Sequence, residues 1–401
     1  MLELKKIRIL FDFITIFFVG ISLFPSDDIE NLCKCNTNFA LKLYSELKKD
    51  RGNLFFSPYS ISQVLTMAYA GAKGETALEI KKTLSFTLEN HGIYNAIYKL
   101  NENLKQAHQN KGADLYLANS LWLQTGYPLL PDYISLLNKY FQTVITPVDF
   151  KGSSQKISKL INLWVEKTTK AKIKNFINSH SIQPDTVLIL INAIYFKAKW
   201  QNRFDKKQTI DKDFIMLNGQ TKFVPFMQQR AEFGYTEIPL AQILELPYAG
   251  NRLSMLILLP AGNSSLEKLE NELSVKNLAV WLSRISNQPV NVTLPRLKIT
   301  WGTKLLNDNL ISLGMRSAFL PGKSDFSAMD GSKTLFISQV LHKAFIEVNE
   351  SGSEAAAASA VTMKRNASRG IEFNADHPFL FLIFDRATNS ILFIGRVTNP
   401  E

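Results

Sequence analysis

The sequence predicts an α+β fold built on antiparallel sheets. Amphipathic helical patterns gather early in the chain and strand patterns late, without the regular alternation that builds a doubly wound parallel sheet. The 401 residues, 46% of them hydrophobic, show no repeat, linker or break in composition. We therefore expect one large unit with a sizeable core.

Each expected element follows from a local pattern. Apolar residues at helical spacing predict helices, and the second helix begins at Ser60, a residue type that caps helix amino termini. Runs of branched and aromatic residues predict strands. The expected helices cover residues 36–47, 60–72, 94–107 and 156–173, and the expected strands cover residues 115–123, 186–196, 243–248, 253–260, 290–300, 379–384 and 390–397.

The amino terminus has the pattern of a secretory signal peptide. Basic residues within the first eight positions precede an apolar run over residues 9–24, and small residues are spaced for cleavage after Ser22. A membrane anchor is disfavoured, because the run holds 16 residues and Asp12 interrupts it, whereas a bilayer span needs roughly 20. We expect a signal peptide over residues 1–22, a single domain over residues 23–401, and secretion to the extracellular space.

Charge and cysteine usage narrow the class of protein. The formal net charge of +11 suits acidic polysaccharides or membrane surfaces but identifies no specific partner. The two cysteines, Cys33 and Cys35, exclude a disulfide framework. Their spacing is poor for an internal bridge, so free thiols and an intermolecular bridge both stay open.

Motifs of catalysis and metal binding are missing from the sequence. The five histidines are not at zinc-ligand spacing with a glutamate between them, and no glycine-rich phosphate loop or nucleophile elbow occurs. The basic segment over residues 166–175 is more typical of a solvated helix face than of a nucleic-acid site. We expect no enzyme, no metal site, no nucleic-acid partner and no membrane partner.

Eight segments, in order, resemble signatures of the serpin family of protease inhibitors. A single segment would be weak evidence, but eight in the family's order are strong, and the likeness runs over nearly the whole mature chain. The segments are "NLFFSPYSISQVLTMAYAGAKGET", "LINAIYFKAKW", "ELPYAGNRLSMLILLP", "VTLPRLKI", "LGMRSAF", "ISQVLHKAFIEVNESGSEAAAA", "HPFLFLI" and "ILFIGRVTNP".

The resemblance implies a fold and an activity. The fold would be a serpin fold with three β-sheets, eight to nine helices and an exposed reactive loop at about residues 350–372. Serpins offer that loop as bait to serine or cysteine proteases, and the inhibitory type traps the acyl-enzyme when the cleaved loop inserts into the main sheet. The chain is therefore expected to be a monomeric, secreted suicide-substrate inhibitor. The alternative is a non-inhibitory serpin that acts as a carrier or binding protein.

The loop residues suit insertion into a sheet. Successive side chains of a strand face opposite sides, so every second residue of an inserting segment enters the interior. A charged or bulky side chain there would meet a desolvation or overpacking cost. With Ser353 as the first inward residue, the inward set is Ser353, Ala355, Ala357, Ser359 and Val361, and the outward set is Glu354, Ala356, Ala358 and Ala360.

The resemblance also implies roles outside the inserting segment. Glu350 and Gly352 match the hinge of the loop, where glycine tolerates unusual backbone angles. Two further groups match the shutter, a polar group beneath the sheet that must open, and the breach, the point where the loop enters. The shutter residues are Ser57, Ser60, Asn192 and His342, and the breach residues are Trp200, Lys343 and again Glu350.

Two bonds compete as the cleavage site. Counting from Glu350 by the usual family length places the cut between Asn366 and Ala367. A hinge shorter by one residue places it between Arg365 and Asn366. We favour Arg365, because trypsin-like proteases bind arginine through a buried carboxylate.

The sequence gives weaker signals for glycosylation and for cofactor binding than for the reactive loop. Sequons occur at Asn263, Asn291, Asn349 and Asn366, and we favour Asn263 because its segment is turn-like. No cofactor is expected, with a heparin-like sulphated polysaccharide as an open alternative. Its candidate ligands, with acidic and neutral residues between them, are Lys99, Lys105 and Lys111.

Overall fold

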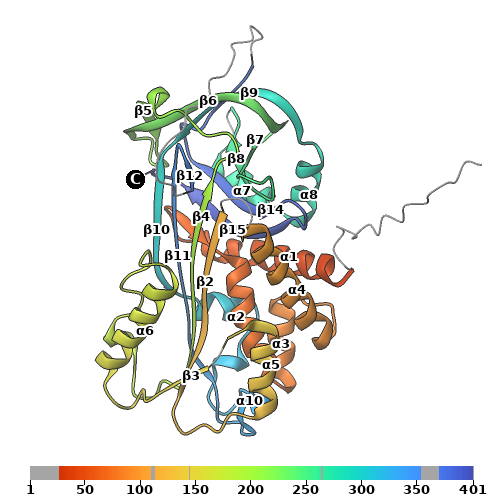
Figure 1. Ribbon diagram of the computed structural model, residues 1–401, viewed down its shortest axis with the longest axis vertical. Helices are drawn as coiled ribbons and strands as arrows, with labels where there is room; N and C mark the ends of the chain where they lie inside the picture. The colour runs from red at the N-terminus through yellow and green to blue at the C-terminus, as the bar shows by residue number, and fades with distance from the viewer. Residues whose placement is uncertain (1–26, 110–112, 144, 263–264, 354–369, 401) are drawn as a thin grey trace, which may run out of the picture.

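The computed structural model describes residues 27–109, 113–143, 145–262, 265–353 and 370–400. It confirms the α+β fold (Figure 1). The described residues form ten α-helices, where eight to nine were expected, together with three short 3-10 helices and fifteen strands. The α-helices are α1 (Asp27–Leu47), α2 (Pro58–Ala70), α3 (Gly74–Thr83), α4 (Asn90–Gln109), α5 (Pro131–Phe141), α6 (Ser154–Thr168), α7 (Leu266–Glu272), α8 (Val275–Ser283), α9 (Asn307–Ser312) and α10 (Ser327–Asp330). The 3-10 helices are η1 (Ser179–Ser181), η2 (Lys206–Gln208) and η3 (Ser317–Phe319).

A six-stranded sheet runs along the length of the molecule (Figure 1). Its order is β10, β11, β12, β4, β2, β3, and β11 also pairs directly with β4, in parallel. The strands are β2 (Ala113–Gln124), β3 (Ile145–Val148), β4 (Leu188–Lys199), β10 (Leu297–Leu305), β11 (Ile337–Asn349) and β12 (Gly352–Ser353).

Hydrogen bonding joins the other strands into one sheet of nine, not into two separate sheets as the resemblance implied. The reason is the 18-residue strand β6, which pairs with β5, β7 and β9 along its length. The strands are β1 (Leu54–Phe56), β5 (Ile210–Ile215), β6 (Thr221–Ile238), β7 (Ala241–Pro247), β8 (Leu253–Pro260), β9 (Ser286–Pro295), β13 (Ile371–Asn374), β14 (Phe379–Asp385) and β15 (Ser390–Val397).

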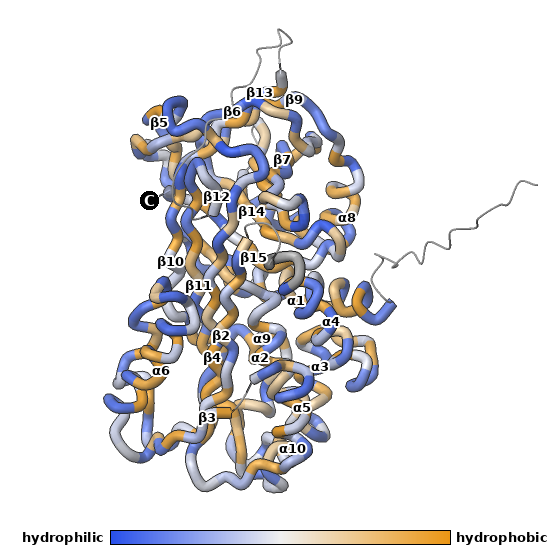
Figure 2. Tube along the Cα trace, in the orientation of Figure 1, coloured by the Kyte–Doolittle hydropathy of each residue, from blue (hydrophilic) through white to orange (hydrophobic). Residues whose placement is uncertain are grey.

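Two hydrophobic clusters cover the two faces of the six-stranded sheet. The larger packs α1 and α2 against β14, β15 and one face of the sheet, with Phe39, Phe55 and Phe393 fully buried. The smaller lies beneath α6 on the other face and contains Trp122 and Ile161. Figure 2 shows hydrophobic residues along β2 and β4 in the middle of the sheet.

The helix expected over residues 156–173 is wrong at its carboxyl end. α6 ends at Thr168, and Lys170 and Ala171 adopt positive φ angles of 52° and 59°, which no helix continues. The hydroxyl of Thr169 donates to the carbonyl of Val165 (2.8 Å) and accepts from the amide of Ile173 (3.2 Å). These bonds end the helix and turn the chain back across the sheet.

The two cysteines lie in α1, and both thiols are free and buried. Burial raises the pKa of the Cys33 thiol to about 11. Among the described helices, none is long and apolar enough to cross a membrane. Within the same residues, no group of three histidine, cysteine or acidic side chains is placed to hold a metal ion.

Candidate functional site

The short strand β12 holds two residues from the start of the predicted loop, Gly352 and Ser353, inside the six-stranded sheet. Ser353 pairs with Val348 of β11 on one side and with Ala198 of β4 on the other, antiparallel to both. Farther along, β11 and β4 pair directly and in parallel as far as Phe345 and Tyr195. We call this β11–β4 boundary the seam. Because its two strands are parallel, a third strand entering between them can be antiparallel to both, as β12 already is.

Gly352 and Ser353 fit this position closely. Gly352 has a φ of +143°, and a Cβ atom there would lie 2.0 Å from the carbonyl oxygen of Ala198. Only glycine fits such an approach. The buried Ser353 hydroxyl lies 2.7 Å from the Tyr248 hydroxyl, and the Tyr248 ring stacks on Trp200 at a centroid distance of 4.6 Å. Ser353 therefore faces the interior, as expected.

Glu350 is fixed at the turn between β11 and β12. Its side chain accepts from Arg296 Nε (2.8 Å) and from the Thr209 hydroxyl (2.5 Å). Burial alone would raise the pKa of this carboxyl, but the bonds from Arg296 and Thr209 outweigh burial, so the pKa lies below its usual value.

Trp200 holds the backbone of the same turn. Its indole Nε1 donates to the carbonyl of Asn349 (2.9 Å), and its amide donates to the carbonyl of Ser351 (3.0 Å). Trp200 and Glu350 are thus brought together at the entry of the seam.

A row of polar side chains crosses the middle of the sheet. Asn119 of β2, Asn192 of β4 and His342 of β11 are register partners, and we call them the polar row. Asn192 donates to Asn119 and accepts from His342 Nδ1. The last of these bonds spans the seam, so a strand that enters as far as this level must break it.

Two serines at the amino-terminal end of α2, the capping residue Ser57 and Ser60 within the helix, complete the polar group predicted as a shutter. The Ser60 hydroxyl donates to Asn119 Oδ1 (3.0 Å) and accepts from Asn192. The Ser57 hydroxyl caps α2 by accepting from the Ser60 amide (3.1 Å), and the Ser57 amide donates to His342 Nε2 (3.3 Å). The four predicted shutter residues therefore lie together, with Asn119 as a fifth member.

His342 is neutral in the folded protein. Its Nε2 accepts a bond from a backbone amide, so the ring proton is on Nδ1, which faces Asn192. The ring is fully buried, and burial lowers its pKa to about 3. Together the bonds and the burial make the imidazole a fixed member of the polar row.

Lys343 lies apart from the breach residues. It pairs in register with Ala193, on the opposite face of β11 from His342, and its ammonium donates to the carbonyls of Lys174 (2.8 Å) and Asn175 (3.2 Å). Burial lowers the pKa of this ammonium. Lys343 is thus not a partner of Glu350; it holds the chain that follows α6.

That chain, residues 169–177, crosses the seam on the sheet's outer face, and we call it the strap. On the β2–β4 side, Lys170 and Lys172 lie over the rings of Tyr116 (5.8 Å) and Tyr195 (5.9 Å). On the β10–β11 side, Lys343 and the Thr303 hydroxyl bond to strap carbonyls. The strap therefore ties together the two strands that an inserting segment must separate.

We expect Lys343→Met to loosen the strap. Methionine keeps the length of the side chain but loses both bonds, and bonds to a charged donor contribute roughly 1.5–3 kcal/mol. Hydrogen exchange at the amides of Ile173 and Ile177 should become about tenfold faster or more. Lys174→Met is the matched control, because that side chain is 63% exposed. Equal exchange in Lys343→Met and wild type would contradict the role given to Lys343.

Part of the predicted site lies outside the described residues. This holds for the inserting residues Glu354, Ala355, Ala356, Ala357, Ala358 and Ser359, for Arg365, Asn366 and Ala367 at the competing bonds, for Asn263, and for Lys111. Their assignments stay predictions.

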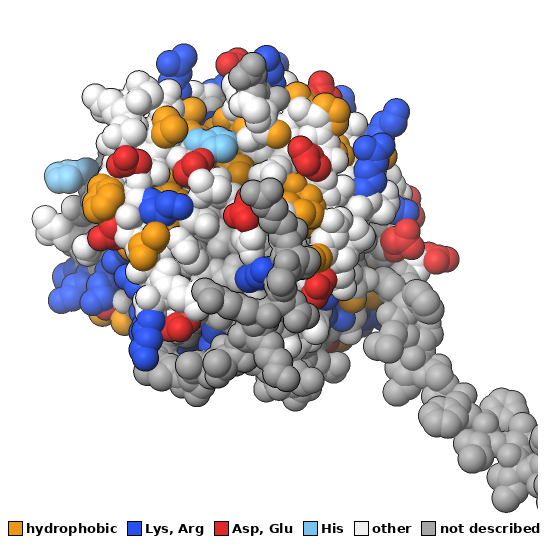
Figure 3. Space-filling view, turned by 90° about the horizontal axis from the view of Figure 1, so that it is seen from above, with side chains coloured by type: hydrophobic (Ala, Val, Ile, Leu, Met, Phe, Trp, Pro, Cys, Tyr) orange, Lys and Arg blue, Asp and Glu red, His pale blue; other side chains and the backbone are white. Residues whose placement is uncertain are grey.

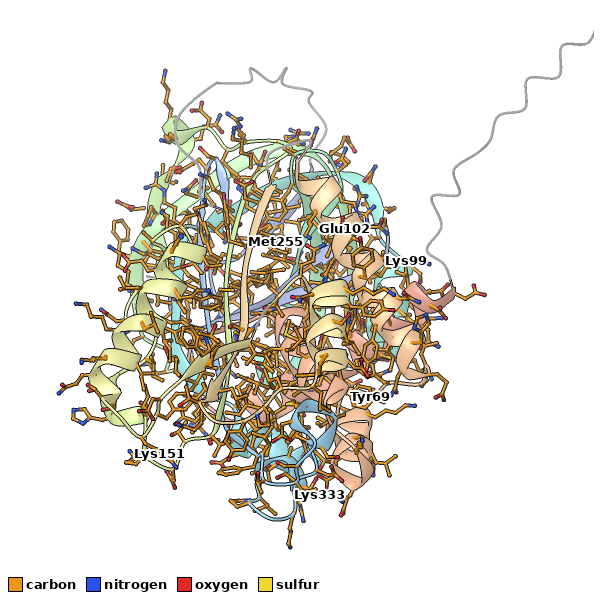
Figure 4. The ribbon with its side chains drawn as sticks, turned by 60° about the horizontal axis from the view of Figure 1, so that its bottom comes forward. Tyr69, Lys99, Glu102, Lys151, Met255 and Lys333 are labelled. Carbon is orange, nitrogen blue, oxygen red and sulfur yellow. The ribbon has the colours of Figure 1, made fainter. Side chains whose placement is uncertain are left out.

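The structure describes the other candidate residues for glycosylation and for polysaccharide binding. Asn291 Nδ2 donates to Glu372 (2.6 Å), and Asn349 Oδ1 accepts from the Ser351 amide (3.0 Å). Lys105 donates to Glu102 (3.0 Å), so its charge is partly balanced. Figure 4 shows Lys99 and Glu102 in the same stretch of α4 at the surface.

The sequence prediction missed several members of the site. Arg296 stands between β9 and β10, inside a run that was predicted as one strand, and nothing in the local pattern indicates its bond to Glu350. Asn119 lies in β2, which was correctly predicted as a strand, and Tyr248, predicted as the end of a strand, directly follows β7. The partners of both residues are distant in sequence. An asparagine within an otherwise apolar strand was the available signal for Asn119.

Comparison with known proteins decides the family. The family model described as Serpin (serine protease inhibitor) matches residues 34–400. The chain belongs to the serpin family. Leukocyte elastase inhibitor A of Rattus norvegicus is 39% identical over 93% of this chain and 100% of its own length. An uncharacterised serpin-like protein of Thermococcus kodakarensis is 40% identical over 91% of this chain and 84% of its own length.

Solved structures agree with this assignment. The crystal structure of Serpin48, a highly specific serpin of the insect Tenebrio molitor, matches with a TM-score of 0.83 and 31% identity over 94% of this chain and 99% of that one. Membership places this serpin in a family of protease inhibitors, not among enzymes.

Proposed function

We propose that this serpin is a secreted suicide-substrate inhibitor of a trypsin-like serine protease. In this mechanism the protease cleaves the loop between Arg365 and Asn366 and forms an acyl-enzyme. The loop then inserts along the seam and carries the tethered protease with it. Secretion rests on the signal pattern of residues 1–22.

The main support for the proposal is the position of β12 between β11 and β4. Gly352 and Ser353, near the start of the predicted loop, already pair with both β11 and β4, antiparallel to each. Residues 354–361 continue the chain with no charged or large side chain on the inward set. An extension of β12 along the seam would therefore meet neither a desolvation nor a steric barrier from its own side chains.

Insertion releases enough free energy to deform a tethered protease. About a dozen added backbone hydrogen bonds at roughly 0.5–1.5 kcal/mol each give on the order of 10 kcal/mol. That is comparable to the whole stability of a domain. The direct β11–β4 pairing that is lost is replaced by pairing on both edges of the new strand.

The choice of protease rests on Arg365 and on the surface around the loop. Seen from above, charged side chains of both signs are scattered among hydrophobic ones over the visible described residues (Figure 3). Over its described residues, this face therefore has no patch of a single sign of charge that would select a strongly charged partner at close range. The residue before the cleaved bond then decides which protease binds the loop. An arginine there fits the specificity pocket of a trypsin-like protease.

We expect trypsin to form an SDS-resistant complex with the protein, near the sum of the two masses. Arg365→Ala should lower the yield of complex by about tenfold or more, because the charged contact in the specificity pocket is lost. Lys364→Ala, the matched control, should leave the yield near wild type. Mass spectrometry of the released carboxyl-terminal peptide should find Asn366 as its first residue.

Two other results would contradict this assignment in different ways. A complex with an asparagine-specific endopeptidase but not with trypsin would place the cut between Asn366 and Ala367. Cleavage of the loop without any complex would favour the carrier or binding protein and end the inhibitory proposal.

A further inference from the structure

The solvent-facing side of α6 carries lysines toward its two ends and leucines between them. The exposed residues of this side are Lys156, Lys159, Leu160, Leu163 and Lys167. They lie three, four, seven and eleven positions after the first of them, which is the spacing of a single helix face. We call these five residues the α6 face. It extends over about 16 Å of the helix, since each residue adds about 1.5 Å.

The opposite side of α6 already packs against the sheet. Ile157, Ile161 and Val165 belong there to the smaller hydrophobic cluster. Leu160 and Leu163 take no part in this packing, because 48% and 55% of their surfaces stay exposed. Figure 1 shows α6 on the flank of the molecule, outside the six-stranded sheet. The helix thus has a second apolar stripe, and this one faces water.

The surroundings of the two leucines are strongly basic. Residues 151–174 contain seven lysines, all of them exposed, and a single acidic residue, Glu166. The Glu166 carboxylate lies 3.7 Å from the ammonium of Lys174, which is outside the α6 face. The three lysines of the α6 face form no ion pair among the described residues. Their charge is therefore available to an anionic partner.

The lysines of α4, the sequence-based candidates for a polysaccharide, have different neighbours. Lys99 and Lys105 have the acidic Glu102 between them, and Glu102 accepts from Lys105 (3.0 Å). The leucines of α4, Leu100 and Leu104, are buried. Exposed leucines among unpaired lysines are thus particular to α6 when the two helices are compared.

The two leucines distinguish between anionic partners. A sulphated polysaccharide would attract the lysines but offers no apolar layer in which leucine could be buried. An anionic lipid surface offers both parts, since its head groups attract lysines and the acyl boundary beneath them takes up apolar side chains. The α6 face therefore fits a lipid surface better than a polysaccharide.

The α6 face is remote from the end of the molecule that carries the reactive loop. β13, which follows the loop, lies at one end of the long axis, and α6 lies in the other half of the molecule (Figure 2). Lys151, in the turn before α6, stands on the same flank as the helix (Figure 4). A surface that holds α6 would thus leave the loop end free.

We propose that the α6 face docks this serpin on an anionic lipid surface. The lysines would lie among phosphate and carboxylate head groups, and Leu160 and Leu163 would enter the apolar boundary below. No membrane partner was expected from the sequence, because helical spacing alone does not separate these two leucines from the core residues of α6. The docking needs no step of the proposed protease inhibition.

Vesicles of phosphatidylserine and phosphatidylcholine in equal parts are the probe, measured by co-sedimentation with the intact protein and without protease. We expect saturable binding to these vesicles and none to vesicles of phosphatidylcholine alone, because a neutral surface does not attract the lysines. No binding to the anionic vesicles, or equal binding to both kinds, would overturn the proposal.

The double exchange Leu160→Gln with Leu163→Gln tests the apolar part of the α6 face. We expect binding weaker by about tenfold or more, because two leucines lose their burial in the lipid. Glutamine is a good helix former, so α6 should stay intact. Leu78→Gln, at a leucine of α3 that is 68% exposed, is the control and should bind as wild type does. Wild-type binding by the double variant would make the α6 face a site for polyanions such as a sulphated polysaccharide, and would overturn the lipid proposal.

Lys159→Gln tests the charged part. We expect binding weaker by about fivefold, the contribution of one lysine near an anionic surface. Lys99→Gln removes the same charge from an exposed position of α4 and should leave binding near wild type. Equal losses in the two variants would assign the binding to net charge and overturn the site. Because no protease is present, a failure of the proposed inhibition would leave these results unchanged.

Discussion

Replacement of Gly352 by alanine should convert this serpin from the proposed inhibitor of trypsin into a substrate. The new Cβ would lie 2.0 Å from the Ala198 carbonyl oxygen and 2.6 Å from the Lys199 Cα, and both atoms belong to the backbone of β4. The φ of +143° adds strain for any residue with a Cβ. β12 cannot then stay between β11 and β4, so insertion loses its starting point. The yield of SDS-resistant complex should fall by about tenfold or more, while the loop is still cleaved.

Gly302→Ala is the control for this experiment. Gly302 lies in β10 of the same sheet, and a Cβ there would meet nothing within 4 Å. Both variants should unfold within a few degrees of wild type, because β12 contributes only two residues to the sheet. A wild-type yield of complex from Gly352→Ala would show that insertion does not begin at β12.

The free energy of unfolding should fall steeply as the pH drops from about 6.5 toward 3, and His342 should cause a large part of that fall. Burial lowers the pKa of His342 to about 3 in the folded protein, against about 6.5 in an unfolded chain. Between these values the unfolded chain is protonated and the folded ring is neutral. Acid therefore favours unfolding, and the stability present above pH 6.5 is progressively lost. Once the pH is below both pKa values, the free energy of unfolding has lost roughly 5 kcal/mol through this group.

His342→Gln should remove much of this dependence, because glutamine has no proton to gain. Denaturant unfolding at several pH values between 4 and 7 measures the difference in slope from wild type. His180→Gln, an exchange at an exposed site, controls for the loss of a histidine and should keep the wild-type slope. If His342→Gln and wild type lose stability in parallel, protonation of His342 does not control unfolding in acid.

The elements that the sequence predicts best are those whose pattern is complete within a short run. β8 (Leu253–Pro260) and β15 (Ser390–Val397) have the bounds that were expected, since each is a buried apolar run limited by turn-forming residues. Residues 290–300 behave differently. They were expected as one strand, but the chain passes from the nine-stranded sheet to the six-stranded sheet there, at Arg296.

The candidate site could be predicted only in part. Gly352 and Ser353 were expected as a hinge and an inward residue; the structure pairs both with β4 and buries Ser353, while the hinge motion stays a prediction. The bonds from Arg296 to Glu350 and from Lys343 to the strap could not be predicted, because they depend on how distant strands and loops come to lie together. The alignment of Asn192 with His342 is likewise a matter of strand register, which no local pattern specifies.

The register of β12 fixes where the rest of an inserted loop would come to lie. Ser353 faces Val348 and Ala198, and each further step along the loop moves both partners one residue back. Six steps bring Ser359 opposite His342 on one side and Asn192 on the other, the same two residues whose bond insertion breaks. A serine hydroxyl both donates and accepts. The loop would thus bring with it a side chain able to repair the polar row at the level where its own passage divides it.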